Sequence, residues 1–192
     1  TLAMQAKDYP DIVTYIVTGD MDALQLVNER TKVLAPSHGL NDGVLYDIQK
    51  VIEKHGLSPS QVPDLKGLQG DSSDNIKGVA GIGPKTAKEL LQKFGTIENI
   101  YNHLDEIKES TRKKLEAGKD DAKFSKMLAT IITNVDVKLD IKKCETCQYD
   151  KSKILQLFEE LEFKSLINKL TSFDNHYSLE QEQSTKLQQS LF

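Results

Sequence analysis

The segment from Lys66 to Phe94, KGLQGDSSDNIKGVAGIGPKTAKELLQKF, constrains the fold of this chain more strongly than any other. It joins an acidic turn, G-D-S-S-D-N, to a glycine-rich run, Gly78–Gly83, and then to a helix that we expect over 84–94. Glycine lets the backbone turn tightly and approach a ligand closely. Pro84 suits the first turn of a helix, because its missing N–H would have no partner there. The segment therefore predicts a glycine hairpin that opens directly into a helix.

The start of this helix is a candidate site for phosphate groups. Its first backbone amides are free to bind an anion. Between Lys77 and Phe94 four lysines accompany a single glutamate, whereas the whole chain has a formal charge of −4. This positive segment in an acidic chain favours a polyanion as the binding partner. Backbone amides and lysines would hold its phosphates without reading the bases. The alternative is a plain joint between two helices. The expected contact residues are Lys77, Gly78, Val79, Gly81, Ile82, Gly83, Lys85 and Thr86.

Two short strands are predicted ahead of this segment. Residues 11–18 form a β-branched and aromatic run that ends at a glycine, which is typical of a buried strand, and 32–35 form a second strand. Residues 23–28 between them look helical. This is an α/β pattern, and open α/β sheets place their sites at the carboxyl ends of strands.

Two aspartate pairs, Asp20 with Asp22 and Asp71 with Asp74, are candidate metal ligands. For the first pair alone, a helix N-cap with a solvated neighbour is an equally good interpretation. Four carboxylates that converge cannot all stay ionised without cations, and their oxygens suit Mg²⁺ or Mn²⁺. A two-metal site uses such carboxylates to activate water and to stabilise the leaving oxygen in phosphodiester hydrolysis. The sequence permits this convergence without establishing it.

The rest of the chain is predicted to be mainly helical. The expected helices cover 44–55, 96–103, 105–117, 121–133 and 151–170, the last as one helix or a pair, with a cap at 58–61 and a short strand at 135–141. A second basic cluster lies between Lys108 and Lys119, where a solvated helix face is at least as good an interpretation as DNA contact. The apolar side of 151–170 is expected to be core; its members are Leu155, Phe158, Leu161, Phe163, Leu166 and Ile167.

Composition excludes several classes of protein. No apolar run approaches the length of a membrane span, and no leader sequence precedes a cleavage site, so we expect a soluble, cytoplasmic monomer. Cys144 and Cys147 form a single C-x-x-C pair. Such a pair is half a zinc site at best, and no second pair or nearby histidine completes it. Reduced thiols without a function are favoured over a redox motif, because the βαβ context is missing.

The two most specific motifs, GDSSDNIKGVAGIGPKTA and TGDMDALQLV, resemble those of the 5′ nuclease family. This family comprises the 5′→3′ exonuclease domain of bacterial DNA polymerase I and its stand-alone and flap-endonuclease relatives. The resemblance covers about residues 1–170, most of the chain by any domain-size measure. It implies a divalent-metal nuclease, acting on DNA with 5′ flaps or 5′ ends in primer removal and repair.

By position, the four aspartates correspond to metal-binding carboxylates of the family, which implies catalytic roles for them. The segment from Gly78 to Thr86 corresponds to the family's helix–hairpin–helix element, here about 66–95, which grips the duplex backbone and often holds K⁺ through main-chain carbonyls. Lys77 stands where the bacterial pattern usually has proline, which implies a looser hairpin entry and an added charge.

The main departure from the family is an absence. Its other metal carboxylates lie in an early strand and in a Glu-Ala-Asp-Asp run before the helix at which this sequence starts, and neither is found here. The basic arch that threads the 5′ strand should also lie upstream. The resemblance therefore implies the C-terminal part of a nuclease. We expect this part alone to be inactive or nearly so, because missing ligands leave the other acids mutually repulsive and the water unactivated.

Residues 171–192 are polar and rich in Gln and Ser, which predicts a flexible tail. Its end, QQSLF, fits the Q-x-x-L-F peptide by which bacterial replication proteins bind the sliding clamp, so Gln188, Leu191 and Phe192 are candidate clamp contacts. An end at this point favours a stand-alone nuclease, with a truncated polymerase I as the alternative.

The predicted fold is α/β. The remnant of a mostly parallel, PIN-like sheet occupies 1–38, and a helical DNA-binding region over 39–170 packs on it as one unit. The alternative function is a non-catalytic helix–hairpin–helix module that binds duplex DNA. The retained acids argue against it, since a binder of a polyanion gains nothing from Asp71 and Asp74 beside its phosphate grip. A phosphatase on a similar sheet does not explain the hairpin.

Overall fold

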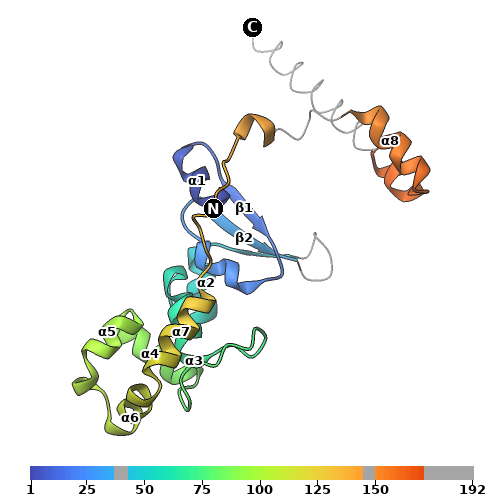
Figure 1. Cartoon of the computed structure of the whole chain (residues 1–192). Coiled ribbons are helices and arrows are strands. Elements are labelled where there is room, and N and C mark those ends of the chain that lie inside the picture. The colour runs from blue at the N-terminus through green and yellow to red at the C-terminus, as the bar shows by residue number, and fades with distance from the viewer. Residues whose placement is uncertain (37–42, 145–149, 171–192) are drawn as a thin grey trace. The chain divides into compact units, whose positions relative to one another are not determined.

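The computed structural model describes residues 1–36, 43–144 and 150–170, which fall into two compact units that divide between Leu139 and Asp140 (Figure 1). The predicted tail with its clamp contacts Gln188, Leu191 and Phe192 lies outside the described residues, as does Cys147. Domain boundaries at 38 and 170 stay predictions. No helix in the described part of the chain has both the length and the apolar character that crossing a membrane requires.

The first unit contains a small mixed sheet. Its strands are β1 (Thr14–Val17), β2 (Thr31–Ala35) and β3 (Val44–Tyr46), in the order β1-β2-β3. β1 runs parallel to β2, with Val17 opposite Leu34, whereas β3 runs antiparallel to β2, with Leu45 opposite Leu34. The two predicted strands are confirmed, and the sheet is mixed where a mostly parallel one was expected.

The helix predicted over 44–55 is wrong in its first turn. Val44–Tyr46 pair with β2 instead, because strand-favouring side chains find a neighbouring strand there. Helix α2 (Ile48–His55) begins after Asp47, whose carboxylate accepts a hydrogen bond from the Lys50 amide at 2.8 Å. It ends at Gly56, which takes the left-handed conformation common after a helix.

One face of the sheet packs on a hydrophobic cluster that includes Leu24, Val33 and Val51. The other face carries Tyr15 and Val17, which are each 54% exposed. The expectation of a buried first strand is therefore wrong, because only alternate side chains of β1 point toward the cluster.

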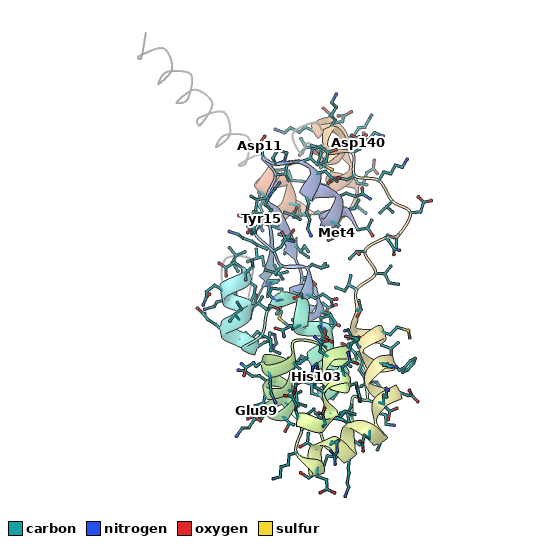
Figure 2. The ribbon with its side chains drawn as sticks, turned by 90° about the vertical axis from the view of Figure 1, so that its left-hand side faces the viewer. Met4, Asp11, Tyr15, Glu89, His103 and Asp140 are labelled. Carbon is teal, nitrogen blue, oxygen red and sulfur yellow. The ribbon has the colours of Figure 1, made fainter. Side chains whose placement is uncertain are left out.

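The helical part of the first unit has its own core, which includes Leu68, Leu91, Ile100 and Leu115. In Figure 2, the labelled residues Glu89 and His103 lie in this helical part, and the labelled residues Met4 and Tyr15 lie in the part with the sheet. The helices, besides a short α1 at Leu2–Gln5, are α3 (Val62–Gln69), α4 (Pro84–Phe94), α5 (Ile97–Asn102), α6 (Glu109–Ala117) and α7 (Lys119–Ala129). α4, α5 and α6 lie within segments predicted to be helical, and α3 follows the predicted cap. The helix predicted over 121–133 is shifted, because α7 begins at Lys119 and ends at Ala129.

The strand predicted at 135–141 is absent, since those residues pair with no strand of the described chain. The segment is held by the Gln5 side chain, whose amide donates to the Val137 carbonyl and accepts from the Leu139 amide, both at 2.7 Å. A side-chain amide thus supplies the two hydrogen bonds that a neighbouring strand would otherwise make.

In the second unit, α8 spans Lys151–Glu160, and residues 164–170 are also helical, as predicted. The expected core side is wrong, because no residue of α8 is buried, and Leu161, Phe163 and Leu166 are exposed. An amphipathic helix buries its apolar side only where an apolar surface opposes it. Cys144, at the end of the 3₁₀ helix Ile141–Cys144, is an exposed free thiol.

Candidate functional site

Helix α3 leads directly into the acidic turn. It ends at Gln69, and Gly70 then adopts φ 78°, a value that L-residues rarely take. Asp71 and Ile76 exchange two backbone hydrogen bonds of 2.8 Å, which close the turn over 71–76. Asn75 takes the left-handed φ of 56°, which asparagine tolerates better than most residues. The turn is therefore held by its own backbone.

Asp22, Asp71 and Asp74 form a carboxylate cluster, in which one oxygen of each lies within 4.8 Å of the others. Asp22 comes from η2, the 3₁₀ helix Met21–Leu26 after β1, and the other two come from the turn after α3. Contacts between η2 and α3 bring these distant segments together. The convergence that the sequence only permits is present for three of its four aspartates.

Asp20 is not a member of the carboxylate cluster. Its carboxylate caps η2 by accepting a hydrogen bond from the Asp22 amide at 2.9 Å, and its own amide donates to Thr18 Oγ1 at 3.0 Å. The N-cap interpretation therefore describes Asp20, whereas Asp22 turns toward the acidic turn. A role for Asp20 as a metal ligand stays a prediction.

Lys66 is the residue of this site that sequence reasoning missed. Its ammonium touches Asp22, and lies 2.5 Å from Asp71 Oδ2 and 3.6 Å from Asp74 Oδ2. The signal in the sequence is the position of Lys66 in the last turn of the helix before the acidic turn. That position alone does not reveal three acidic partners, because one of them lies far away in the sequence.

The cluster fits a divalent cation. Three carboxylates and one ammonium leave a net charge of −3 + 1 = −2. A hydrogen bond from Lys66, helped by one from Ser73, lowers the pKa of Asp71 from 3.8 to about 2, so this carboxyl stays ionised even in acidic solution. Asp22 Oδ1 is buried and touches the Lys66 ammonium. Carboxylate oxygens are suitable ligands for Mg²⁺ or Mn²⁺.

The glycine hairpin has the predicted form. Gly78 and Gly81 adopt left-handed φ values of 65° and 81°, and α4 begins at Pro84 after the N-cap Gly83. Val79 and Ile82 point inward and are each 3% exposed. The two branched side chains therefore anchor the hairpin, and its glycines supply the turns.

The opposite side of the hairpin is open to solvent. Gly81, Gly83 and Lys85 are exposed, and a Cβ atom on Gly83 would meet nothing within 4 Å. The first amides of α4 have no partner within the helix. Thr86 is half-buried, and the exposed Lys77 forms an ion pair with Asp121 at 2.7 Å. This amide-rich surface has the character of a phosphate site.

Residues 57–152 match the family model described as 5′-3′ exonuclease, C-terminal SAM fold. The chain is 45% identical to DNA polymerase I of Caldicellulosiruptor bescii over 162 residues, which are 83% of this chain and 19% of that protein. It is 38% identical to DNA polymerase I of Bacillus subtilis over 186 residues, 96% of this chain and 21% of that protein. The chain thus spans about a fifth of the length of the curated relatives that it matches.

Solved structures share the fold. The bacteriophage T5 5′-exonuclease with bound divalent metal ions (zinc) gives a TM-score of 0.55 at 22% identity, over 66% of this chain and 47% of that chain. The T5 flap endonuclease in a pseudo-enzyme–product complex with DNA and metal ions gives 0.57 at 21% identity, over the same shares. The family model covers half of the sequence, including the acidic turn, the hairpin and the helices around them. The chain belongs to the 5′-3′ exonuclease family.

Proposed function

We propose that this chain forms part of a divalent-metal-dependent 5′→3′ exonuclease and 5′-flap endonuclease that hydrolyses DNA phosphodiesters in primer removal and repair. The observation that carries the proposal is the direct continuity of the carboxylate cluster with the hairpin. The turn that holds Asp71 and Asp74 runs straight into Gly78, and the outward side of the hairpin suits phosphates. A DNA backbone held there would bring a phosphodiester toward the carboxylates.

In this proposal, Asp22, Asp71 and Asp74 hold Mg²⁺ or Mn²⁺, with Asp20 as a further candidate. Bound ions of this kind polarise a water as the nucleophile and stabilise the leaving oxygen. Lys66 offsets part of the negative charge of the ligand oxygens, and it lowers the pKa of Asp71.

The hairpin contributes positioning. Amides around Gly81 and Gly83, with Lys85 and Thr86, would hold the duplex backbone without reading its sequence. Bound K⁺ at hairpin carbonyls is a further proposal from the family resemblance, which a K⁺ titration of duplex affinity tests. Binding of the sliding clamp through the tail is a proposal from sequence, and a pull-down with purified clamp tests it.

The test is a cleavage assay on a labelled 5′-flap duplex in Mg²⁺, with Mn²⁺ binding followed by calorimetry. Because the chain spans about a fifth of its relatives, the assay compares it with the longest polypeptide that its gene encodes. We expect cutting by the longer form and background cutting by the 192 residues alone. In the longer form, Asp71→Asn should lower the cleavage rate about 100-fold or more and weaken Mn²⁺ binding. Its affinity for the duplex should be retained.

Asp105→Asn is the matched control, since Asp105 is exposed and lies outside the carboxylate cluster. It should leave the cleavage rate and Mn²⁺ affinity unchanged. Unchanged turnover in the Asp71→Asn variant would contradict the metal assignment. Duplex binding without cleavage by either polypeptide would instead favour the non-catalytic DNA-binding module.

A further inference from the structure

The acidic turn and the hairpin meet at a neck formed by Gly70 and Gly78. A Cβ atom on Gly78 would lie 2.2 Å from the Gly70 amide nitrogen, and one on Gly70 would lie 2.7 Å from the Ile76 carbonyl oxygen. Just beyond the neck, the Val79 amide donates to the Leu68 carbonyl at 2.8 Å. The two chain segments of the neck thus touch backbone to backbone. A shift of the hairpin would therefore also displace the turn that carries the carboxylates.

Helix α7 packs against both sides of this neck. Before the turn, Gly67 of α3 lets α7 approach closely, because a Cβ atom there would lie 2.9 Å from Lys126 Cβ and 3.2 Å from the Ala122 carbonyl oxygen. After the turn, the Ser125 hydroxyl accepts a hydrogen bond from the Gly78 amide at 3.0 Å. Ser125 is 1% exposed, so without this hydroxyl a buried backbone amide would lose its partner.

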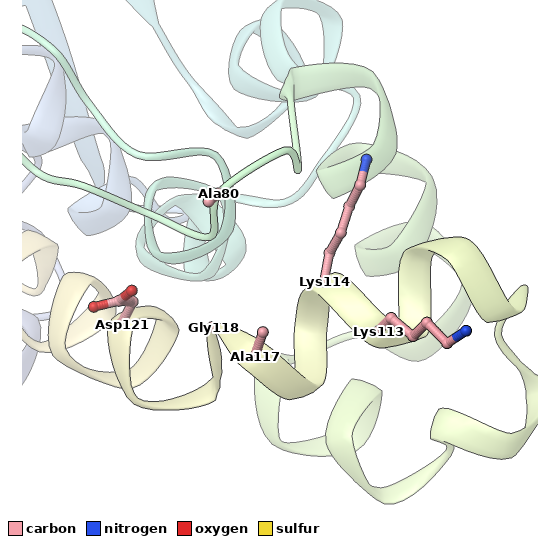
Figure 3. A pocket seen from close by; sticks show the side chains of 6 residues that line it. All are labelled: Ala80, Lys113, Lys114, Ala117, Gly118 and Asp121. Carbon is pink, nitrogen blue, oxygen red and sulfur yellow. The ribbon is translucent and has the colours of Figure 1, made fainter.

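The corner between α6 and α7 supports the hairpin at neighbouring points. Lys114 Nζ donates to the Gly81 carbonyl at 3.1 Å, and Gly118 gives Val79 room to pack. A pocket of about 290 Å³ lies between Ala80 and this corner. Figure 3 shows Lys114 directed toward the hairpin side and Lys113 directed away from it. The Lys114 contact is solvent-exposed and contributes little. The buried Ser125 bond is the side-chain contact that ties the neck to α7.

We infer that Ser125 is a positioning residue, which holds the hairpin at one fixed distance from the carboxylate cluster and thereby selects the phosphodiester that meets the ligands. The inference rests on the proposed function. Successive phosphates of one strand lie about 3.4 Å apart along the duplex axis. A hairpin that moves by a comparable distance would therefore place a neighbouring phosphodiester at the carboxylate cluster. Ser125 itself is buried and is not a member of the carboxylate cluster.

The test maps which phosphodiesters of the bound DNA lie near the carboxylate cluster, and it does not depend on hydrolysis. Fe²⁺ replaces Mg²⁺ in the 192-residue chain bound to an end-labelled flap duplex, and ascorbate with peroxide then generates hydroxyl radicals that cut the DNA backbone nearest the iron. Hydrogen exchange of residues 71–83 is measured on the same samples. We expect a narrow window of cuts with the unmodified chain. Ser125→Ala should widen the window and speed exchange in both the turn and the hairpin, while Fe²⁺ and duplex affinities are kept.

Ser125→Thr, which keeps the hydroxyl, should restore the narrow window. Val51→Ala, a loss of packing in the other hydrophobic cluster, is the control that lowers stability without touching the neck. If Ser125→Ala fails to fold cooperatively, Ser125→Cys, a weaker acceptor of similar size, takes its place with the same expectation. An unchanged window in the Ser125 variant overturns the inference alone. Diffuse cutting by the unmodified chain overturns the proposed function, and the inference with it.

Discussion

At the scale of single residues, the difference between Asp20 and Asp22 shows how local chemistry decides which acid joins the cluster. Both follow β1, and the sequence pattern predicts the same role, that of a metal ligand, for both. Asp20 satisfies the exposed amide at the start of η2, and this cap turns its carboxylate back onto its own chain. Asp22, inside the helix, is free to point toward α3. Lys66 completes the cluster, and no periodicity or motif could have assigned it.

The role of Lys66 predicts a shift in the titration of Asp71. In metal-free buffer, Lys66→Met should raise the pKa of Asp71 from about 2 toward 3.8, because the lysine is the largest cause of its lowering. Because the pKa of Asp71 is lower in the folded state, its ionised carboxylate stabilises the fold above about pH 4. This stabilisation is lost as the pH falls toward 2. The variant should therefore show a weaker loss of stability between those pH values.

The measurement is an NMR titration of the Asp71 carboxyl carbon, paired with thermal unfolding at each pH. Lys77→Met is the control, because Lys77 pairs with Asp121 and not with the cluster. A pKa of Asp71 that stays near 2 in the Lys66→Met variant would show that other donors hold the carboxylate.

At the scale of elements, the hairpin and α4 are the best predicted part of the molecule. The expected helix 84–94 matches α4 residue for residue, because Pro84 and Gly95 mark its ends in the sequence itself. β3 was missed, since its pairing with β2 depends on residues beyond any local window. The strand predicted at 135–141 is wrong in the opposite direction: the segment alternates like a strand, but the described residues offer no neighbouring strand to pair with it.

The hairpin predicts unequal effects of two similar glycine substitutions on duplex binding. Gly81→Val forces a branched side chain into φ 81°, with its Cβ 3.1 Å from Lys114, so it should distort the outward amides. Gly19 lies outside the hairpin and also has open space around it, so Gly19→Ala is the control and should leave duplex affinity unchanged. Fluorescence anisotropy with several duplexes measures the effect. Affinity should fall for Gly81→Val equally on every sequence, and a loss confined to some sequences would contradict backbone recognition.

At the scale of the whole unit, two hydrophobic clusters lie in one compact body, and α3 connects them to the site. The sequence predicted the α/β and helical halves, since periodicity reports which elements form. It did not predict which ion pairs hold the helices together. The buried carboxylate of Asp64 on α3 accepts from the Ile97 amide at 2.9 Å and from Lys126 Nζ at 2.7 Å. It thereby joins α3, α5 and α7 beside the neck.

This buried bridge predicts a large effect on global stability. Asp64 is 3% exposed, so Asp64→Ala leaves a buried amide without its acceptor and takes one carboxylate from Lys126. We expect a loss of about 3 kcal/mol, with an unchanged denaturant slope if the unit still unfolds as a whole. Glu53→Ala removes half of an exposed pair with Lys50 and should change stability by less than about 0.5 kcal/mol. Urea titration of both variants decides the matter, because equal losses would show that the Asp64 bridge contributes no more than a surface pair. A reduced slope for Asp64→Ala alone would show instead that the helices around α3 separate before the sheet unfolds.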